Sequence, residues 1–129
     1  MVRLQWNILS CFSGAGVVLG FMFMLIGLSG CASSSRLADR LQSESVSERI
    51  RACIEAGEQR DMTVLPLLVE RLEDDDADVR FFAILALKKI THKDMGYHYY
   101  DDYKNRVQAV QRWRKWLEQN KGNMKRRGG

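Results

Sequence analysis

The sequence predicts an all-α fold, a short α-solenoid of about two helical repeats closed by a Trp-rich capping helix, after a cleaved signal peptide. Three observations carry this prediction. Apolar residues recur at i, i+3, i+4 and i+7 in several segments, which is the spacing of one helical face. One helix and the turn before it recur after 31 residues, and a repeated helical unit is typical of solenoids. Residues 1–30 carry a single charged side chain, that of Arg3.

The uncharged start of the chain has the pattern of an export signal. Residues 17–26, V-V-L-G-F-M-F-M-L-I, have the composition of a secretory h-region after the cation Arg3. Residues 28–31, L-S-G-C, resemble the lipobox of bacterial lipoproteins. The resemblance implies cleavage after Gly30 and a diacylglyceryl thioether on Cys31, whose thiol is the nucleophile that takes the lipid.

Two alternatives stay open for this segment. The match at Cys31 could be accidental, or the segment could cross a bilayer uncleaved, since about twenty apolar residues suffice. In the second case Arg36 and Arg40, against Arg3 before the span, would place the C-terminal part inside. If the chain is lipidated in a Gram-negative host, Ala32 after the cysteine implies the periplasmic face of the outer membrane.

Composition excludes several classes of function. The net charge is +4, and four cations lie in the last nine residues, so the folded part has no basic footprint for nucleic acid. Once Cys11 leaves with the signal peptide and Cys31 takes lipid, Cys53 is a lone thiol, which we expect to be buried. The sequence holds no Gly-rich phosphate loop and no nucleophile motif. We therefore expect no enzyme activity, no cofactor and no small-molecule substrate.

Residues 31–44 are interpreted as the lipidated cysteine and a flexible tether, although residues 36–42 could form a short helix instead. The folded domain is expected over residues 45–120. Its first helix begins at Ser45, with Glu48 completing a capping box, and ends in a turn over residues 57–61. Thr63 then caps a second helix that tolerates Pro66 in its first turn.

The central helix covers residues 76–91. Its apolar face is formed by Val79, Phe82, Ala83, Ala86, Leu87 and Ile90. The acidic run of residues 73–76 places negative charge at its N-terminus, where the helix dipole favours it, and solvation and capping explain this run better than a metal site. Because the segment is apolar most of the way round, we expect it to be covered on two sides.

The repeat identifies the domain. A shift of 31 residues aligns Ser45 with Asp76 and Arg49 with Arg80. The pattern L-P-x-L-x-x-x-L-x-D-D-D-x-x-V-R-x-x-A-x-x-A-L over residues 65–87 resembles the HEAT repeat family, and the resemblance covers residues 45–119. It implies that Asp74 and Arg80 bond across neighbouring repeats, although the position equivalent to Asp74 in the first unit is occupied by Ser43.

Aromatic residues gather in the last part of the domain. The last helix, over residues 103–120, is expected to use Trp113 and Trp116 to close the open end of the solenoid, and residues 121–129 to form a basic disordered tail. Large rings also suit protein-binding surfaces. The candidate protein-binding residues are Tyr97, Tyr99, Tyr100, Tyr103, Trp113 and Trp116.

These observations predict a membrane-anchored lipoprotein that acts as a non-catalytic protein-interaction or scaffold module in the cell envelope. Its expected partners are an unidentified protein and the membrane, reached through lipid on Cys31. The alternative is a metal-binding or enzymatic envelope protein that uses His92, His98 and Asp101. No HxxxH or HExxH pairing joins these residues, so a polar connecting loop explains them more simply.

Overall fold

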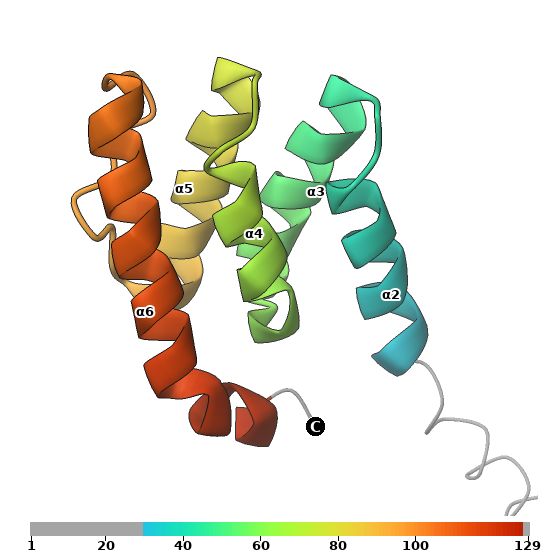
Figure 1. Cartoon of the computed structure of the whole chain (residues 1–129). Coiled ribbons are helices and arrows are strands. Elements are labelled where there is room, and N and C mark those ends of the chain that lie inside the picture. The colour runs from blue at the N-terminus through green and yellow to red at the C-terminus, as the bar shows by residue number, and fades with distance from the viewer. Residues whose placement is uncertain (1–29, 128–129) are drawn as a thin grey trace, which may run out of the picture. The chain divides into compact units, whose positions relative to one another are not determined.

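The computed structural model describes residues 30–127, and these are all helices, turns and loops without a strand (Figure 1). The elements are α2 (Gly30–Leu41), α3 (Val46–Gln59), the short 3₁₀ helix η2 (Met62–Val64), α4 (Leu65–Arg71), α5 (Ala77–Thr91) and α6 (Tyr103–Arg127). Residues 1–29 of the predicted signal peptide lie outside the described residues, which begin at its last residue, Gly30. None of the helices that are described has the length and apolar character needed to cross a bilayer. The predicted all-α fold is confirmed.

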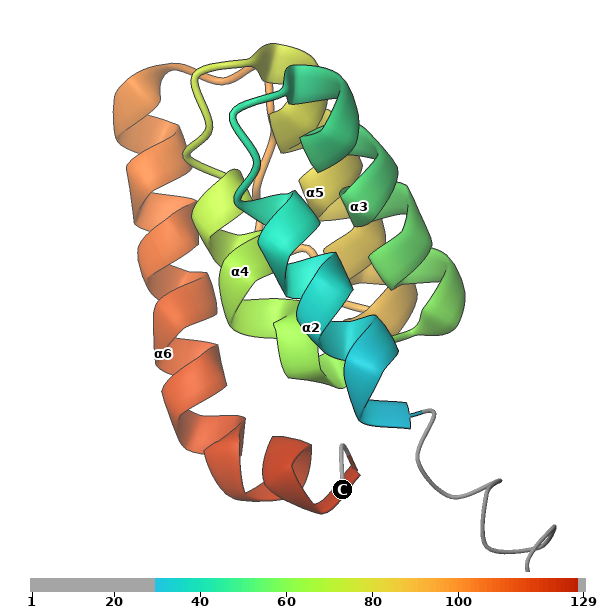
Figure 2. The same ribbon diagram turned by 90° about the vertical axis from the view of Figure 1, so that its right-hand side faces the viewer.

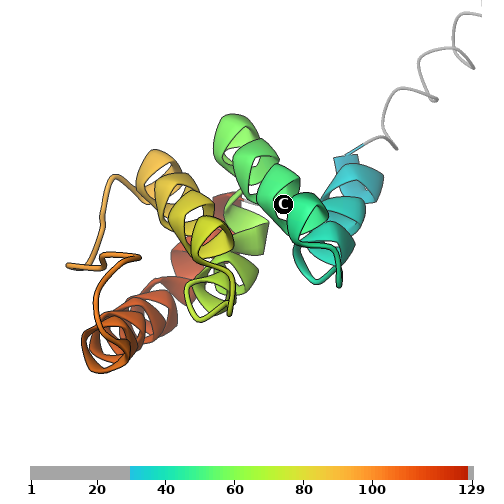
Figure 3. The same cartoon turned by 90° about the horizontal axis from the view of Figure 1, so that it is seen from above.

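From Ser33 on, the described residues form one compact unit of two helical layers. Viewed from above, α3 and α5 lie side by side in one layer, while α2, α4 and α6 make the other (Figure 3). Contacts link α3 with α5, α4 with α5, and α4 with α6. The pairs α2–α3 and α4–α5 thus stack as two repeats of a short solenoid, and α6 packs beside the second pair.

The expectation of a flexible tether over residues 31–44 is wrong for most of this segment. Residues 30–41 are helical, and Leu37 and Leu41 are fully buried in the core. Arg40 adds ion pairs to Glu48, at 3.2 Å, and to Glu55, at 2.5 Å, on α3. Leu37 and Leu41 stand four residues apart and so share one helical face, which makes the alternative short helix the better interpretation.

The first predicted helix also needs two corrections. Ser45 occupies the N-cap of α3, but its side chain makes no capping hydrogen bond, and its Oγ lies 3.0 Å from Ser47 Oγ instead. Glu48 pairs with Arg40 and Arg51 and does not complete a capping box. The turn expected to begin at Gly57 starts later. α3 continues to Gln59 and ends at Arg60, whose left-handed φ of 51° closes it.

Aspartates cap the short helix η2 and the central helix α5. Asp61, rather than the predicted Thr63, starts η2, and its carboxylate accepts a hydrogen bond from the Thr63 N–H at 2.8 Å. α4 then begins with Pro66 in its first turn. Asp76 caps the central helix α5 by accepting hydrogen bonds from the N–H groups of Asp78 and Val79.

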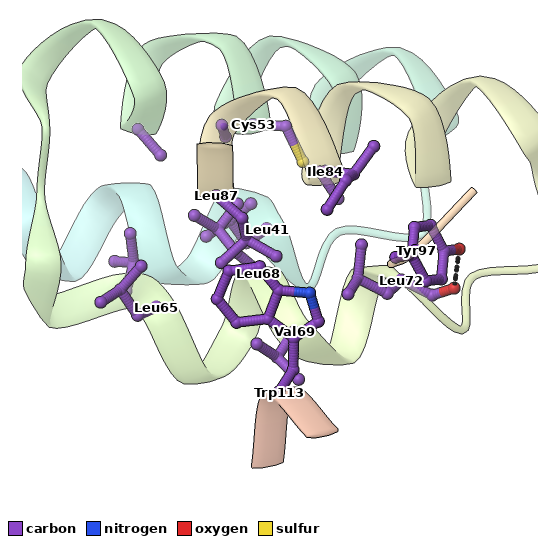
Figure 4. Close-up of a cluster of buried hydrophobic side chains, with 14 of the residues drawn as sticks. Leu41, Cys53, Leu65, Leu68, Val69, Leu72, Ile84, Leu87, Tyr97 and Trp113 are labelled. Carbon is purple, nitrogen blue, oxygen red and sulfur yellow. Dashed lines mark hydrogen bonds between the residues drawn. The ribbon is translucent and has the colours of Figure 1, made fainter. Parts of the chain in front are cut away.

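The core lies between the two layers, around α4 and α5 (Figure 4). Leu68 and Val69 of α4 face Leu87 of α5, and Trp113 enters from α6 against them. Tyr97 donates a buried hydrogen bond from its hydroxyl to the Leu72 carbonyl at 2.5 Å. The last helix is longer than expected. It continues to Arg127 through the segment predicted to be disordered, and Met124 packs against the core.

Candidate interaction surface

A cross-repeat ion pair joins the two helix pairs. The Arg49 Nε of α3 lies 2.9 Å from Asp74 Oδ2 in the turn after α4, and Arg49 Nη2 donates to Asp74 Oδ1 at 3.0 Å. Arg71 adds a second cation at 3.2 Å, and the Asp74 side chain is only 4% exposed. Asp74 therefore takes the cross-repeat role implied by the HEAT resemblance, with Arg49 as its partner.

Arg80 repeats the contacts of Arg49 one unit further on. Arg49 Nη1 donates to the carbonyls of Ser43 and Glu44, at 2.8 and 2.9 Å. Arg80 Nη1 donates to those of Asp74 and Asp75, at 2.7 and 2.8 Å, 31 residues later in each case. Where Arg49 finds a carboxylate in the next turn, Arg80 Nε finds the Tyr99 carbonyl at 3.4 Å. The arginine–carboxylate bond between neighbouring units therefore occurs between the first and second repeats and is not continued from Arg80.

The candidate aromatic residues separate into buried and exposed groups. Tyr97 and Trp113 are buried in the core, so neither can belong to a contact surface in this fold. Trp116 is half-buried and meets Trp113 edge to face, with ring centroids 5.7 Å apart. Tyr100 and Tyr103 are 70% and 72% exposed. The expectation of six binding residues is therefore corrected for two of them, since desolvated core rings have no free face.

Half-buried rings connect the exposed Tyr100 of the loop with α5. The Phe81 ring meets Phe82 at 5.2 Å and Tyr99 at 5.0 Å between centroids, and Tyr99 meets Tyr100 at 5.2 Å. His98 stacks on Tyr100 at 5.5 Å. These contacts make one continuous band of rings that runs from the α3/α5 layer to the loop before α6. Edge-to-face pairs of this kind hold the rings in a fixed arrangement.

The α3/α5 layer carries the other exposed apolar side chains that sequence reasoning did not single out. Ile54 and Leu85 are 40% and 43% exposed, and together with Phe82 they line a groove of about 370 Å³ between α3 and α5. Gly57 and Ala86 meet at the floor of this groove. Helical spacing alone places Ile54 on the apolar face of its helix with Cys53 and Leu85 on the apolar flank of the central helix, so only the packing of α3 against α5 shows that both side chains stay exposed.

The alternative site at His92, His98 and Asp101 is not assembled. His92 closes α5 in a left-handed conformation, with a φ of 58°, and lines a hollow beside Trp116 and Asn120. His98 stacks on Tyr100 instead, and the Asp101 carbonyl accepts a hydrogen bond from Arg106. Within residues 30–127, no three His, Cys, Asp or Glu side chains are grouped to hold a metal ion.

Cys53 is buried beside α5. Burial raises the pKa of its thiol to about 12, so the thiol stays protonated at neutral pH and is a poor nucleophile. Burial likewise raises the pKa of Tyr97 to about 12. Cys53 therefore packs as a small apolar group, as the sequence predicts.

Two stacked helix pairs, joined by an arginine–aspartate bond, define a short α-solenoid. Residues 34–97 match the family model for HEAT repeats. The match begins in α2 and ends at Tyr97, so it takes in both helix pairs and leaves out α6. These residues are therefore similar to HEAT repeats, which are generally protein-interaction scaffolds. Neither the curated proteins nor the solved structures gave a match to the chain.

Proposed function

We propose that the chain is a lipoprotein whose HEAT-like domain holds a protein partner close to a membrane in the cell envelope, without catalysing a reaction. Lipid on Cys31 would anchor it, after cleavage at Gly30. In a Gram-negative host the anchor would lie in the periplasmic face of the outer membrane. Because α2 joins the folded domain at Ser34, only Ala32 and Ser33 separate the anchor from the domain.

The distribution of exposed apolar groups supports the binding role. Ile54 and Leu85 project from the α3/α5 layer. The rings of Phe81, Tyr99 and Tyr100 contact one another in turn and extend this apolar surface to the loop before α6. The outer side of α6 is polar, with Lys104, Arg112 and Lys115 exposed. An apolar surface with polar surroundings marks a protein-interaction site, and exposed tyrosines are frequent at such sites.

The anchor is tested by intact mass and membrane fractionation of the wild-type chain and Cys31→Ser. We expect the wild type to lose residues 1–30, to gain the mass of the lipid and to fractionate with membranes. The serine variant should gain no lipid mass and should not be processed at Gly30, because serine offers no thiol for the thioether. Identical mass and identical fractionation of the two chains would remove the anchor from this proposal.

The binding surface is tested by placing a photo-crosslinking amino acid at Leu85 or Tyr100, with Lys115 on the outer side of α6 as the matched control position. All three side chains are exposed. Irradiation of intact cells should give a discrete protein adduct from the first two positions and none from the control. Adducts of the same size from all three positions would argue against a defined surface.

A further inference from the structure

The two ends of the helical unit carry opposite charge. The turns at the end where α3, α5 and α6 begin are acidic. Their carboxylates belong to Glu73, Asp75, Asp76, Asp101 and Asp102, of which Glu73 pairs with Arg114, while the Asp74 side chain, 4% exposed, is matched by Arg49 and Arg71. The arginines at this end are bonded to the same turns, as Arg49 is to Asp74 and Arg80 is to the Asp75 carbonyl. This end therefore presents mainly negative charge.

The opposite end, where α3, α5 and α6 finish, presents exposed cations. They are Arg60, Lys89, Lys93, Lys121, Lys125 and Arg126. Four carboxylates lie at this end, and two of them are neutralised, since Asp94 pairs with Lys88 at 3.6 Å and Glu118 pairs with Lys121 at 2.7 Å. The cations other than Lys121 outnumber the remaining two, those of Glu58 and Asp61. Because α6 continues as a helix to Arg127, its last cations are held at this end rather than dispersed in a disordered tail.

The chain enters the folded unit at this same basic end. Ser34 donates a hydrogen bond to Asp61 Oδ2 at 3.1 Å and lies 2.6 Å from the Thr63 hydroxyl oxygen, on either side of Met62. Met62 and Arg126 line one hollow. Both side views show the last turns of α6 bending beneath the unit on the side where α2 begins (Figures 1 and 2). Cys31 precedes Ser34 by three residues and is therefore within about 11 Å of it.

We propose that this basic end is a docking surface for an anionic lipid bilayer, and that it orients the anchored domain with its acidic turns away from the membrane. The proposal rests on the proposed lipid anchor for the direction of the membrane. The helices run between the two ends, so docking would stand them upright. The α3/α5 layer would then face sideways, where a partner can reach it.

The charges are sufficient for such an effect. A cation near an anionic membrane surface contributes about a factor of five to binding, so several cations at one end can orient a domain that the lipid already holds at the membrane. Attraction of this kind acts over roughly 10 Å at moderate salt and is screened at high salt. Because only Ala32 and Ser33 connect Ser34 to Cys31, the basic end of the domain stays close to the distance over which this attraction acts.

The test uses the lipid-free chain from Ser33, because the described residues from Ser33 on form one compact unit and the described core lies within it. Co-sedimentation is measured with vesicles of phosphatidylcholine alone and with equal parts of phosphatidylcholine and phosphatidylglycerol. Lys125→Glu with Arg126→Glu is the test variant. Lys104→Glu with Lys115→Glu is the matched control, since it changes the net charge equally at exposed positions elsewhere on α6. Circular dichroism checks that all three chains fold.

We expect wild type and control to bind the anionic vesicles at low salt, to release them at high salt, and to leave neutral vesicles unbound. The test variant should bind at least thirtyfold more weakly, from the loss of two cations. Equal weakening in both variants would overturn the proposal, because net charge alone would explain it, and so would absence of wild-type binding. This chain lacks Cys31, so neither result depends on lipidation, which the mass of Cys31→Ser tests separately.

Discussion

At the scale of single residues, Asp74 holds the two repeats together. Its carboxylate receives Arg49 and Arg71 and also accepts the Asp76 N–H at 3.1 Å. We expect Asp74→Ala to lower the free energy of unfolding by roughly 3–5 kcal/mol, because it leaves two poorly solvated guanidinium groups without their counter-charge. Urea denaturation measures this change.

Asp75→Ala is the matched control for that variant. Asp75 is exposed and contributes its backbone carbonyl, not its carboxylate, to Arg80. Its removal should change stability by less than about 0.5 kcal/mol. Equal effects of the two substitutions would show that the turn is stabilised by its total charge and not by the bonds of Asp74.

The buried Cys53 and Tyr97 make stability sensitive to alkaline pH. The folded-state pKa of each is about 12, against ordinary values of 9.0 and 10.0. Between those values and pH 12 the folded chain retains protons that the unfolded chain has lost. This contribution is therefore full below pH 9 and is lost as pH rises, by about 1.4 kcal/mol per pH unit for each group.

Thermal unfolding between pH 8 and pH 11 measures this loss. Cys53→Ala should give a shallower decline in Tm above pH 9 than wild type, although its Tm at pH 8 is lower because the substitution leaves a small cavity. A decline of the same slope in both chains would assign the alkaline sensitivity to other groups.

At the scale of elements, the close approach of α3 and α5 depends on Gly57. A Cβ at this position would lie 3.1 Å from the Ala86 Cα and 3.4 Å from its Cβ. We expect Gly57→Ala to destabilise the domain by about 1 kcal/mol, because overpacking outweighs the gain in helix propensity. Denaturant unfolding provides the measurement.

Gly122→Ala supplies the comparison for Gly57→Ala. Gly122 also lies within a helix, but its Cβ would meet no atom within 4 Å. This substitution should stabilise the chain by about 0.5–1 kcal/mol, through helix propensity alone. A stabilised Gly57→Ala variant would mean that α3 and α5 can separate at little cost.

α2 is a structural element of the domain, so truncating its core residues should be costly. Leu37→Ala is expected to lower stability by roughly 2–5 kcal/mol, because Leu37 is 1% exposed. Arg36→Ala, on the exposed side of the same helix, should change it by less than about 0.5 kcal/mol. If both variants melt like wild type, α2 does not belong to the folded unit.

At the scale of the whole molecule, the first and last helices of the stack, α2 and α6, expose polar side chains on their outer faces. α2 exposes Arg36 and Asp39, and α6 exposes Arg112 and Lys115. Terminal elements with polar outer faces allow a solenoid to stay soluble without further repeats. We expect the lipid-free chain from Ser33 to sediment as a monomer and to unfold in one cooperative helical transition. A concentration-dependent dimer would favour a solenoid completed by a second chain.

How far the fold could be predicted varied with the distance between interacting residues. The central helix and its aspartate cap follow from local spacing and helix capping, and both were predicted. The assignment of residues 32–44 to a tether failed because serine-rich composition outweighed two leucines four residues apart. The capping box at Ser45 failed because Arg40, from another helix, competes for Glu48.

The candidate surface shows the same division. Aromatic composition pointed to residues 97–116, but composition cannot separate a buried ring from an exposed one. Tyr97 is buried because its hydroxyl finds the Leu72 carbonyl 25 residues earlier in the sequence, whereas Tyr100 has no such partner among the described residues and remains exposed. The groove at Ile54 and Leu85 exists only because α3 and α5 lie side by side.

By itself the sequence determined that this domain is helical and repeats once, because helical periodicity, capping residues and a 31-residue shift are all local properties of the chain. Tertiary structure alone decided that Arg49 reaches Asp74, that α2 completes the first repeat, and that the start of α2 and the cations of α6 lie at one end. Those features arise from packing between segments that are distant in sequence, and the residue pattern of one segment does not predict which other segment will pack against it.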